Sequence, residues 1–171
     1  MRRRTAMDPT KVIMGKRVLI VDDEKDILEV LTELLSVCKI DRAASFEEAK
    51  ALLEKYDYHV AVLDIMGVDG YELLKIANER GIPALMLTAH ALSEESLKHS
   101  VEQGAAYYVP KDEISNIAVY VADVIDAIEK NKNPLARWFD RLSSVFDVIF
   151  VGPDWREREK EFWKDKLSLD D

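Results

Sequence analysis

Short continuous runs of apolar residues alternate with amphipathic stretches along the chain as far as about residue 130. Four runs have the length and composition of strands that are buried on both faces of a sheet. They occupy residues 18–21, 60–63, 84–87 and 106–109. Residues 40–44 form a weaker run that suits the edge of a sheet. The pattern therefore predicts five strands.

The segments between these runs have helical spacing. Apolar residues recur at helical intervals over residues 27–35, and similar patterns cover residues 70–79, 93–103 and 114–130. Ser45 followed by Glu48 is a capping box that opens another helix, and Ser93 is a suitable N-cap. Strands that alternate with helices predict an α/β fold, with a doubly wound parallel sheet covered by helices on both faces.

Length and charge bound the organisation of the chain. The 171 residues suffice for one domain of ordinary size plus an extension. A net charge of -9 argues against nucleic acid as a partner. Residues 1–15 are the exception because they are basic, and we expect them to be a disordered leader, with phosphate contact as the alternative.

The sequence also restricts disulfides and membrane insertion. Cys38 is the only cysteine, which excludes an intrachain disulfide and a cysteine metal cluster. No stretch approaches the ~20 apolar residues of a membrane span, and the N-terminal segment lacks the apolar run of a secretory signal. We therefore expect a cytoplasmic protein for which a membrane is an unlikely partner.

Chemically active residues follow the predicted strands. Ligands of open parallel sheets bind beyond the carboxyl ends of the strands, so residues at those positions converge on one surface. The residues found there are Asp22, Asp23, Asp64, Thr88 and Lys111. Each residue alone is readily explained as a cap, a turn former or a solvated side chain. Their joint occurrence at four strand ends instead indicates a site.

These residue types suit phosphoryl chemistry. Three carboxylates brought together repel one another and demand a cation, and Mg²⁺ prefers such oxygen ligands together with water and phosphate oxygens. The Thr88 hydroxyl and the Lys111 ammonium can each hold a phosphate oxygen. Asp64 can be the nucleophile, because carboxylates form aspartyl-phosphates.

Five segments of the chain have a recognisable pattern, namely V-L-I-V-D-D-E at 18–24, V-L-D-I-M at 62–66, D-G-Y-E-L-L at 69–74, L-T-A at 87–89 and G-A-x-x-Y-V-x-K at 104–111. In these segments the chain resembles the receiver domain of bacterial two-component response regulators. The resemblance covers residues 16–130. The resemblance implies a flavodoxin-like fold with strand order 2-1-3-4-5. It also implies that a histidine kinase or phosphotransfer protein phosphorylates Asp64 in a phosphorelay.

The resemblance further implies a role for each site residue. Asp23, Asp64 and the backbone carbonyl of Met66 bind Mg²⁺ directly, whereas Asp22 acts mainly through water. Thr88 and Lys111 hold the phosphoryl group, and Tyr108 turns inward together with Thr88 as the switch. Met66 and His90 flank the path of an attacking water and so influence the lifetime of the phosphate.

The chain departs from the family pattern in two places. The loop from Asp64 to Gly70 is about two residues shorter than usual and contains no proline, which affects the metal-binding carbonyl and the start of the next helix. Asp112 replaces the proline that usually follows Lys111 through a cis bond. Because a cis bond before a non-proline residue costs ~2.5–4 kcal/mol, we expect a trans bond here.

Residues 131–171 lie outside the resemblance and form a predicted α-helical extension. Pro134 can open a helix that ends at Gly152 and Pro153, and Asp154 can cap a second helix. An apolar stripe along residues 135–150 and all three tryptophans of the chain lie in this extension. Three arrangements are open, namely packing on its own domain, docking to a partner or second copy, and lying on a membrane. Our hypothesis is a homodimer through residues 134–167.

Two other functions compete with phosphoryl acceptance. A phosphohydrolase with an aspartyl-phosphate needs a second acid two residues after the nucleophile, where this chain has Met66. A receiver-fold binding module or scaffold that works without phosphorylation is the stronger alternative. We expect no separate catalytic domain, and the extension shows no helix-turn-helix pattern or basic face that would indicate an output.

Overall fold

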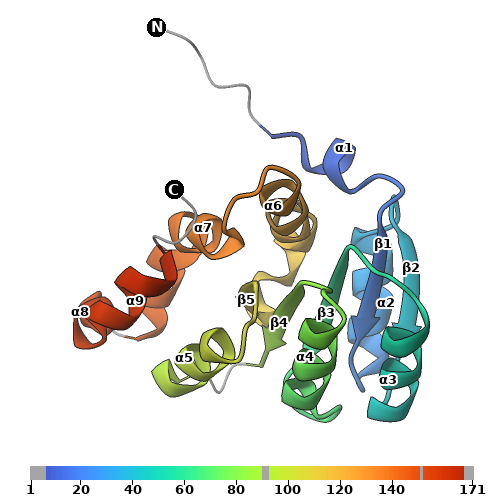
Figure 1. The fold of residues 1–171 in the computed structure, drawn as a ribbon, viewed down its shortest axis with the longest axis horizontal. Coiled ribbons are helices and arrows are strands. Elements are labelled where there is room, and N and C mark those ends of the chain that lie inside the picture. The colour runs from blue at the N-terminus through green and yellow to red at the C-terminus, as the bar shows by residue number, and fades with distance from the viewer. Residues whose placement is uncertain (1–6, 90–92, 151, 168–171) are drawn as a thin grey trace, which may run out of the picture.

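A five-stranded parallel sheet forms the centre of the protein (Figure 1). The computed structural model describes residues 7–89, 93–150 and 152–167. The strands are β1 (Arg17–Val21), β2 (Lys39–Ala43), β3 (Val60–Asp64), β4 (Ala84–Thr88) and β5 (Tyr107–Pro110), in the order β2-β1-β3-β4-β5. All four neighbouring pairs are parallel. The predicted doubly wound fold and its strand order are confirmed.

Helices cover both faces of this sheet. The helices that follow the strands are α2 (Lys25–Leu34), α3 (Phe46–Lys55), α4 (Gly70–Glu79), α5 (Glu94–Glu102) and α6 (Ile117–Glu129). A 3₁₀ helix, η1 (Lys111–Asn116), precedes α6. Helices α2 and α6 contact each other, as do α3 and α4. The predicted capping box opens α3, where Ser45 accepts a hydrogen bond from the Glu48 amide at 3.2 Å.

The N-terminal segment is helical where we expected disorder. Helix α1 (Pro9–Ile13) begins with a proline at its first turn, and Asp8 accepts a hydrogen bond from the Lys11 amide. Ile13 is buried, and α1 packs against α6. Disorder is therefore wrong for residues 7–15, because one apolar side chain finds a place in the core. Residues 1–6 lie outside the described part of the chain.

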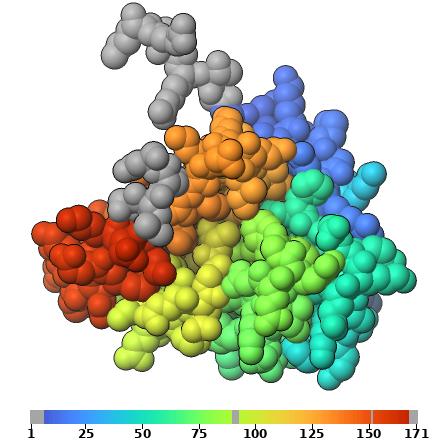
Figure 2. All heavy atoms as spheres, in the orientation of Figure 1, coloured from blue at the N-terminus to red at the C-terminus, as the bar shows by residue number. Residues whose placement is uncertain are grey.

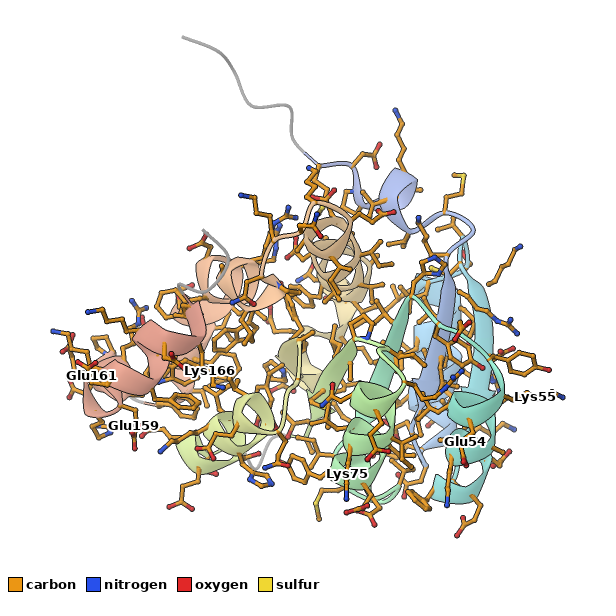
Figure 3. All side chains as sticks on the ribbon, in the orientation of Figure 1. Glu54, Lys55, Lys75, Glu159, Glu161 and Lys166 are labelled. Carbon is orange, nitrogen blue, oxygen red and sulfur yellow. The ribbon has the colours of Figure 1, made fainter. Side chains whose placement is uncertain are left out.

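The C-terminal extension packs on its own domain. It comprises α7 (Pro134–Ile149), α8 (Asp154–Arg158) and α9 (Lys160–Leu167), and α7 contacts both α6 and β5. Figure 2 shows the red α8–α9 segment at one end of the molecule beside the yellow-green α5. Glu161 and Lys166 are among the charged side chains of this end of the molecule (Figure 3).

The apolar stripe of the extension is occupied within one chain. Its buried members are Leu135, Trp138, Leu142 and Phe146, and Trp155 and Trp163 are buried beside them. A left-handed Gly152 lies between α7 and α8, as the break at Gly152 and Pro153 predicts. The exposed stripe that motivated a homodimer is therefore absent from the conformation described here.

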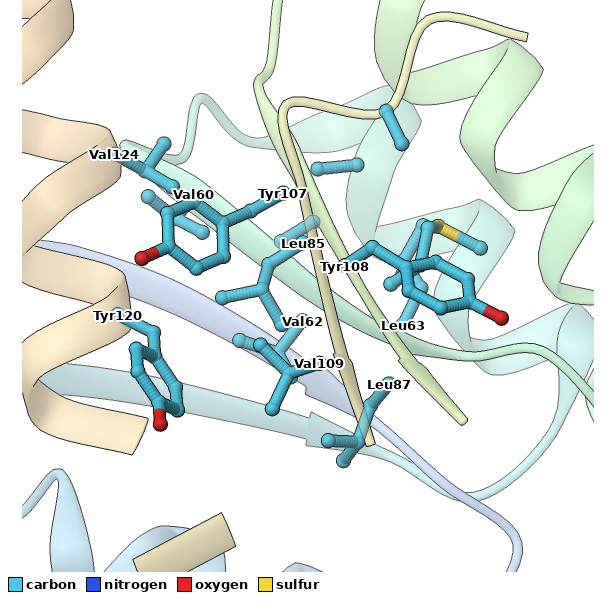
Figure 4. Close-up of a cluster of buried hydrophobic side chains, with 14 of the residues drawn as sticks. Val60, Val62, Leu63, Leu85, Leu87, Tyr107, Tyr108, Val109, Tyr120 and Val124 are labelled. Carbon is cyan, nitrogen blue, oxygen red and sulfur yellow. The ribbon is translucent and has the colours of Figure 1, made fainter. Parts of the chain in front are cut away.

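The core positions the ends of the strands. Every residue of β3 and β4 is buried, and the edge strand β2 is largely accessible, as predicted. Figure 4 shows that neighbouring side chains on β5 point in opposite directions. Tyr107 is turned toward Tyr120 and Val124, whereas Tyr108 lies on the opposite side of the strand. The register pairs Asp64 with Leu87 and Thr88 with Pro110, so these strands end at one edge.

Candidate functional site

Three aspartates meet at the carboxyl edge of the sheet. Asp22 and Asp23 follow β1, and Asp64 is the last residue of β3. One carboxylate oxygen from each lies within 4.8 Å of the others. Asp22 and Asp64 are buried, whereas Asp23 is exposed. This set of hard oxygen donors, open on one side, fits a divalent cation such as Mg²⁺.

Lys111 joins the cluster from the end of β5. Its Nζ lies 3.0 Å from Asp22 Oδ2, 3.3 Å from Asp64 Oδ1 and 3.0 Å from Glu24 Oε1. Asp22 Oδ1 also accepts a hydrogen bond of 2.9 Å from the Glu24 amide. The bond from Lys111 to Asp112 is not cis, as predicted, and η1 begins at Lys111. The lysine thus reaches Asp64 without the usual proline.

Burial and mutual repulsion shape the charges of the site. Burial raises the pKa of Asp64 to about 6, and the neighbouring charge of Asp22 adds to this effect. Burial likewise raises the pKa of Asp22. For Lys111, burial opposes the charged form, but Asp22 and Glu24 outweigh it and raise its pKa. One ammonium facing several carboxylates leaves excess negative charge, which a cation can neutralise.

Thr88 and Tyr108 connect the site to the surrounding helices. Thr88 is buried at the end of β4, and its Oγ1 lies 3.4 Å from the Ala89 carbonyl oxygen. The Tyr108 hydroxyl hydrogen-bonds Ser96 Oγ on α5 at 3.0 Å and lies near the Thr88 side chain. Burial raises the pKa of Tyr108 to about 12. Tyr108 therefore lies inward and neutral, with Thr88 on one side and α5 on the other.

The comparisons with known proteins agree with this geometry. The family model described as "Response regulator receiver domain" matches residues 18–122. The chain belongs to that family. Phosphorylation and Mg²⁺ binding are typical of receiver domains, and such domains generally are not separate enzymes.

Among curated proteins, the chain is similar to plant and bacterial response regulators. It is 34% identical over 107 residues to the two-component response regulator ARR18 of Arabidopsis thaliana, covering 59% of this chain and 17% of that protein. It is 32% identical over 130 residues to Arabidopsis ARR12, covering 70% and 21%. It is 32% identical over 103 residues to the regulatory protein VanRc of Enterococcus gallinarum, covering 57% and 44%. The matches support the receiver family rather than a bacterial branch, and the chain spans about a fifth of the first two relatives.

Solved receiver domains share the fold. A CheY-like receiver domain protein from Methanospirillum hungatei JF-1 superposes with a TM-score of 0.62 at 28% identity, covering 68% of this chain and 98% of that one. The DrrB receiver domain, described as BeF3-activated, gives 0.59 at 28% identity and covers 66% and 99%. DrrB comes from Thermotoga maritima.

The short loop after Asp64 packs against the carboxylates of this receiver domain. A Cβ at Gly67 would lie 2.4 Å from Asp23 Oδ2, and one at Gly70 would lie 2.2 Å from the Asp64 carbonyl oxygen. Gly67 and Asp69 both have left-handed φ angles, of 83° and 54°. The loop thus turns tightly over the acids, and α4 still begins at Gly70, the predicted start.

Two predicted residues and several missed ones complete the description. The Met66 side chain is 72% exposed, and the role of its carbonyl stays a prediction. His90 lies outside the described residues. Sequence reasoning missed Glu24, Gly67, Ser96 and Trp138 as neighbours of the site. The Gly67 signal was available in the shortened loop, whereas the other contacts depend on tertiary packing.

We expect Gly67→Ala to weaken Mg²⁺ binding by roughly tenfold or more, since displacing a ligand or straining its support commonly costs 10–100-fold in metal affinity. The new Cβ occupies the position of the Asp23 carboxylate and the backbone is left-handed. Titration with Mg²⁺ measures the affinity. Gly81→Ala is the matched control, because Gly81 has φ +71° but no neighbour within 4 Å of the added Cβ. Equal Mg²⁺ affinities in the two variants would contradict the assignment.

Proposed function

We propose that this receiver domain accepts a phosphoryl group on Asp64 from a histidine kinase or phosphotransfer protein. The observation that carries the proposal is the contact of buried Asp64 with Lys111, at 3.3 Å, inside a cluster of three carboxylates. Asp64 also pairs in the sheet with Leu87, which directly precedes Thr88, the last residue of β4. Nucleophile, ammonium and hydroxyl thus share one edge.

The side chains divide the reaction among them. An Asp64 oxygen attacks phosphorus as the bond from phosphorus to the donor nitrogen breaks, and the departing imidazole keeps that electron pair and takes a proton. Lys111 and Thr88 hold phosphoryl oxygens by charge-assisted hydrogen bonds. Asp23, Asp64 and the Met66 carbonyl would hold Mg²⁺ directly, with Asp22 acting through water. The ion supplies positive charge for the phosphoryl oxygens.

The proposal extends to the cellular setting. A single cysteine fits a reducing compartment, and we place the reaction in the cytoplasm. Within the described ranges, no helix is long and apolar enough to cross a membrane. Homodimerisation through residues 134–167 stays a prediction, and it requires the extension to leave its own domain because its apolar stripe is buried there.

Phosphoryl acceptance is tested with acetyl phosphate and Mg²⁺ on the full chain. Intact mass should show one added phosphoryl group, and excess chelator should prevent the addition. Beryllofluoride, present in the DrrB structure by its description, serves as a second probe. An unmodified chain under these conditions would contradict the proposal and favour the phosphorylation-independent scaffold.

We expect Met66→Asn to shorten the lifetime of the phosphorylated protein. Met66 is exposed in the loop after Asp64, and its thioether orients water poorly, whereas an amide donates and accepts hydrogen bonds. We expect dephosphorylation to be several-fold faster than in wild type. The rate is measured as the loss of phosphorylated protein with time after acetyl phosphate is removed by desalting. Met14→Asn is the control, because Met14 is also exposed but is distant from Met66 in the sequence. An unchanged or slower decay in Met66→Asn would contradict the role of this side chain.

A further inference from the structure

The C-terminal extension is attached to the receiver domain in two unlike ways. Helix α7 is held as part of the core. Trp138 is fully buried, and its Nε1 donates a 2.8 Å hydrogen bond to the Tyr108 carbonyl oxygen. Arg141 Nη2 pairs at 3.0 Å with buried Asp123, which also accepts a 2.6 Å hydrogen bond from Tyr107. Opening this contact would leave a buried carboxylate without its cation, so α7 is firmly attached to the receiver domain.

Helices α8 and α9, residues 154–167 and here termed the clasp, are held to α5 by surface ion pairs. Arg158 pairs with Glu94, with Nε 3.0 Å from Oε2, and their side chains are 51% and 36% exposed. Lys98 Nζ lies 3.1 Å from Glu159 Oε1, with exposures of 35% and 48%. Figure 3 places Glu159 on the clasp at the side toward α5. Such exposed pairs stabilise weakly and are screened by salt.

The seam between the clasp and α5 is incompletely packed. A cavity of about 210 Å³ runs along it, lined by residues that include Leu97, Trp155 and Trp163. Side chains that face a cavity lose dispersion contacts on that side. Toward α5 the clasp therefore has weak polar attachment and imperfect apolar packing, which are the features of a contact that opens before the domain unfolds. Toward α7 it is held more firmly, by buried Trp155 and Trp163 and by the 2.8 Å hydrogen bond from Trp155 Nε1 to Asp147 Oδ1.

The first turn of α5 links the clasp to the phosphorylation site. Glu94, the partner of Arg158, is the first residue of α5. Ser96, two residues later, hydrogen-bonds the Tyr108 hydroxyl, which lies near the Thr88 side chain. Ser96 also lies 3.4 Å from the Tyr71 hydroxyl on α4. One helical turn thus contacts both the clasp and Tyr108, the neighbour of Thr88.

We propose that the clasp is a releasable intramolecular partner of α5 that opens when Asp64 is phosphorylated. The inference rests on the proposed function. In the closed conformation the Thr88 hydroxyl faces the Ala89 carbonyl and Tyr108. Turning it to a phosphoryl group on Asp64 removes a neighbour from Tyr108. The loss loosens the hydrogen bond between Tyr108 and Ser96, and the first turn of α5 shifts away from Arg158. By linkage, opening the clasp strengthens binding at Asp64 to the same extent.

The clasp itself is tested first, without phosphate. Arg158→Glu places a carboxylate against Glu94, and we expect amide hydrogen exchange in residues 154–167 to rise roughly 5–30-fold, with α7 unchanged. Lys160→Glu makes the same charge change at an exposed clasp position and should leave exchange near wild type. The swap of Glu94→Arg with Arg158→Glu should restore protection. Unchanged exchange in Arg158→Glu would overturn the inference that these ion pairs hold the clasp. Equal increases in Arg158→Glu and Lys160→Glu would also overturn it.

The link to the site is tested on the full chain with beryllofluoride and Mg²⁺, and with acetyl phosphate. Phosphorylation by intact mass and exchange of residues 154–167 are measured on the same samples. We expect amide exchange in residues 154–167 to rise in wild type and not in Asp64→Asn. We also expect Arg158→Glu to bind beryllofluoride more tightly than wild type, by a factor no larger than the increase in clasp exchange that this substitution causes. Phosphorylation with unchanged clasp exchange would overturn the inference alone. Absence of phosphorylation would overturn the proposed function and the inference with it.

Discussion

Replacement of Asp64 by Asn should abolish phosphorylation by acetyl phosphate. The neutral amide lacks the anionic oxygen that attacks phosphorus, and it removes one charge from the cluster that holds the cation. Labelling should fall to background, which intact mass and phosphate-affinity electrophoresis both measure. The variant should fold, because Asp64 is buried beside Asp22 and loss of its charge relieves repulsion.

Asp69→Asn is the matched control for this experiment. Asp69 lies at the start of α4 near the site and is exposed, and it belongs to neither the carboxylate cluster nor the Lys111 contacts. Its left-handed backbone suits asparagine, so the substitution removes one nearby charge without strain. We expect labelling near the wild-type level. Wild-type labelling of Asp64→Asn would show that another residue is the acceptor.

The sheet and the site were predictable because both depend on strand ends. Continuous apolar runs mark strands that are buried on both faces, and every residue of β3 and β4 is buried. Once parallel strands are assigned, their carboxyl ends share one edge. The sequence therefore predicted that Asp64 and Lys111 meet, and they lie 3.3 Å apart.

Contacts between distant segments were not predictable in the same way. Ile13 stands in a basic segment that carries no strong periodicity, and only the surface of α6 makes α1 part of the core. The apolar stripe of α7 was evident, but a stripe does not say which surface covers it. Packing on its own domain was one of three open arrangements. The hydrogen bond from Trp138 to the Tyr108 carbonyl is a tertiary contact without a sequence pattern.

Trp138 provides the sharpest test of the packing of the extension. Its side chain is fully buried, and its ring lies near those of Phe146, Trp155 and Trp163, with centroid distances of 5.6, 6.4 and 5.7 Å. We expect Trp138→Ala to lower the free energy of unfolding by about 3–5 kcal/mol, as large-to-small substitutions of buried tryptophan do. Urea unfolding followed by circular dichroism measures this change.

Two further substitutions separate core packing from the clasp. Trp138→Phe keeps an aromatic ring but loses the hydrogen bond to Tyr108, so its cost should be smaller than that of Trp138→Ala. Trp163→Ala removes a buried ring from the clasp, where release of α9 limits the loss, and it should also destabilise less. If the extension were undocked in solution, all three variants would unfold like wild type. A large loss confined to Trp138→Ala instead makes α7 part of the cooperative unit that includes β5, and leaves α8 and α9 as the segment free to move.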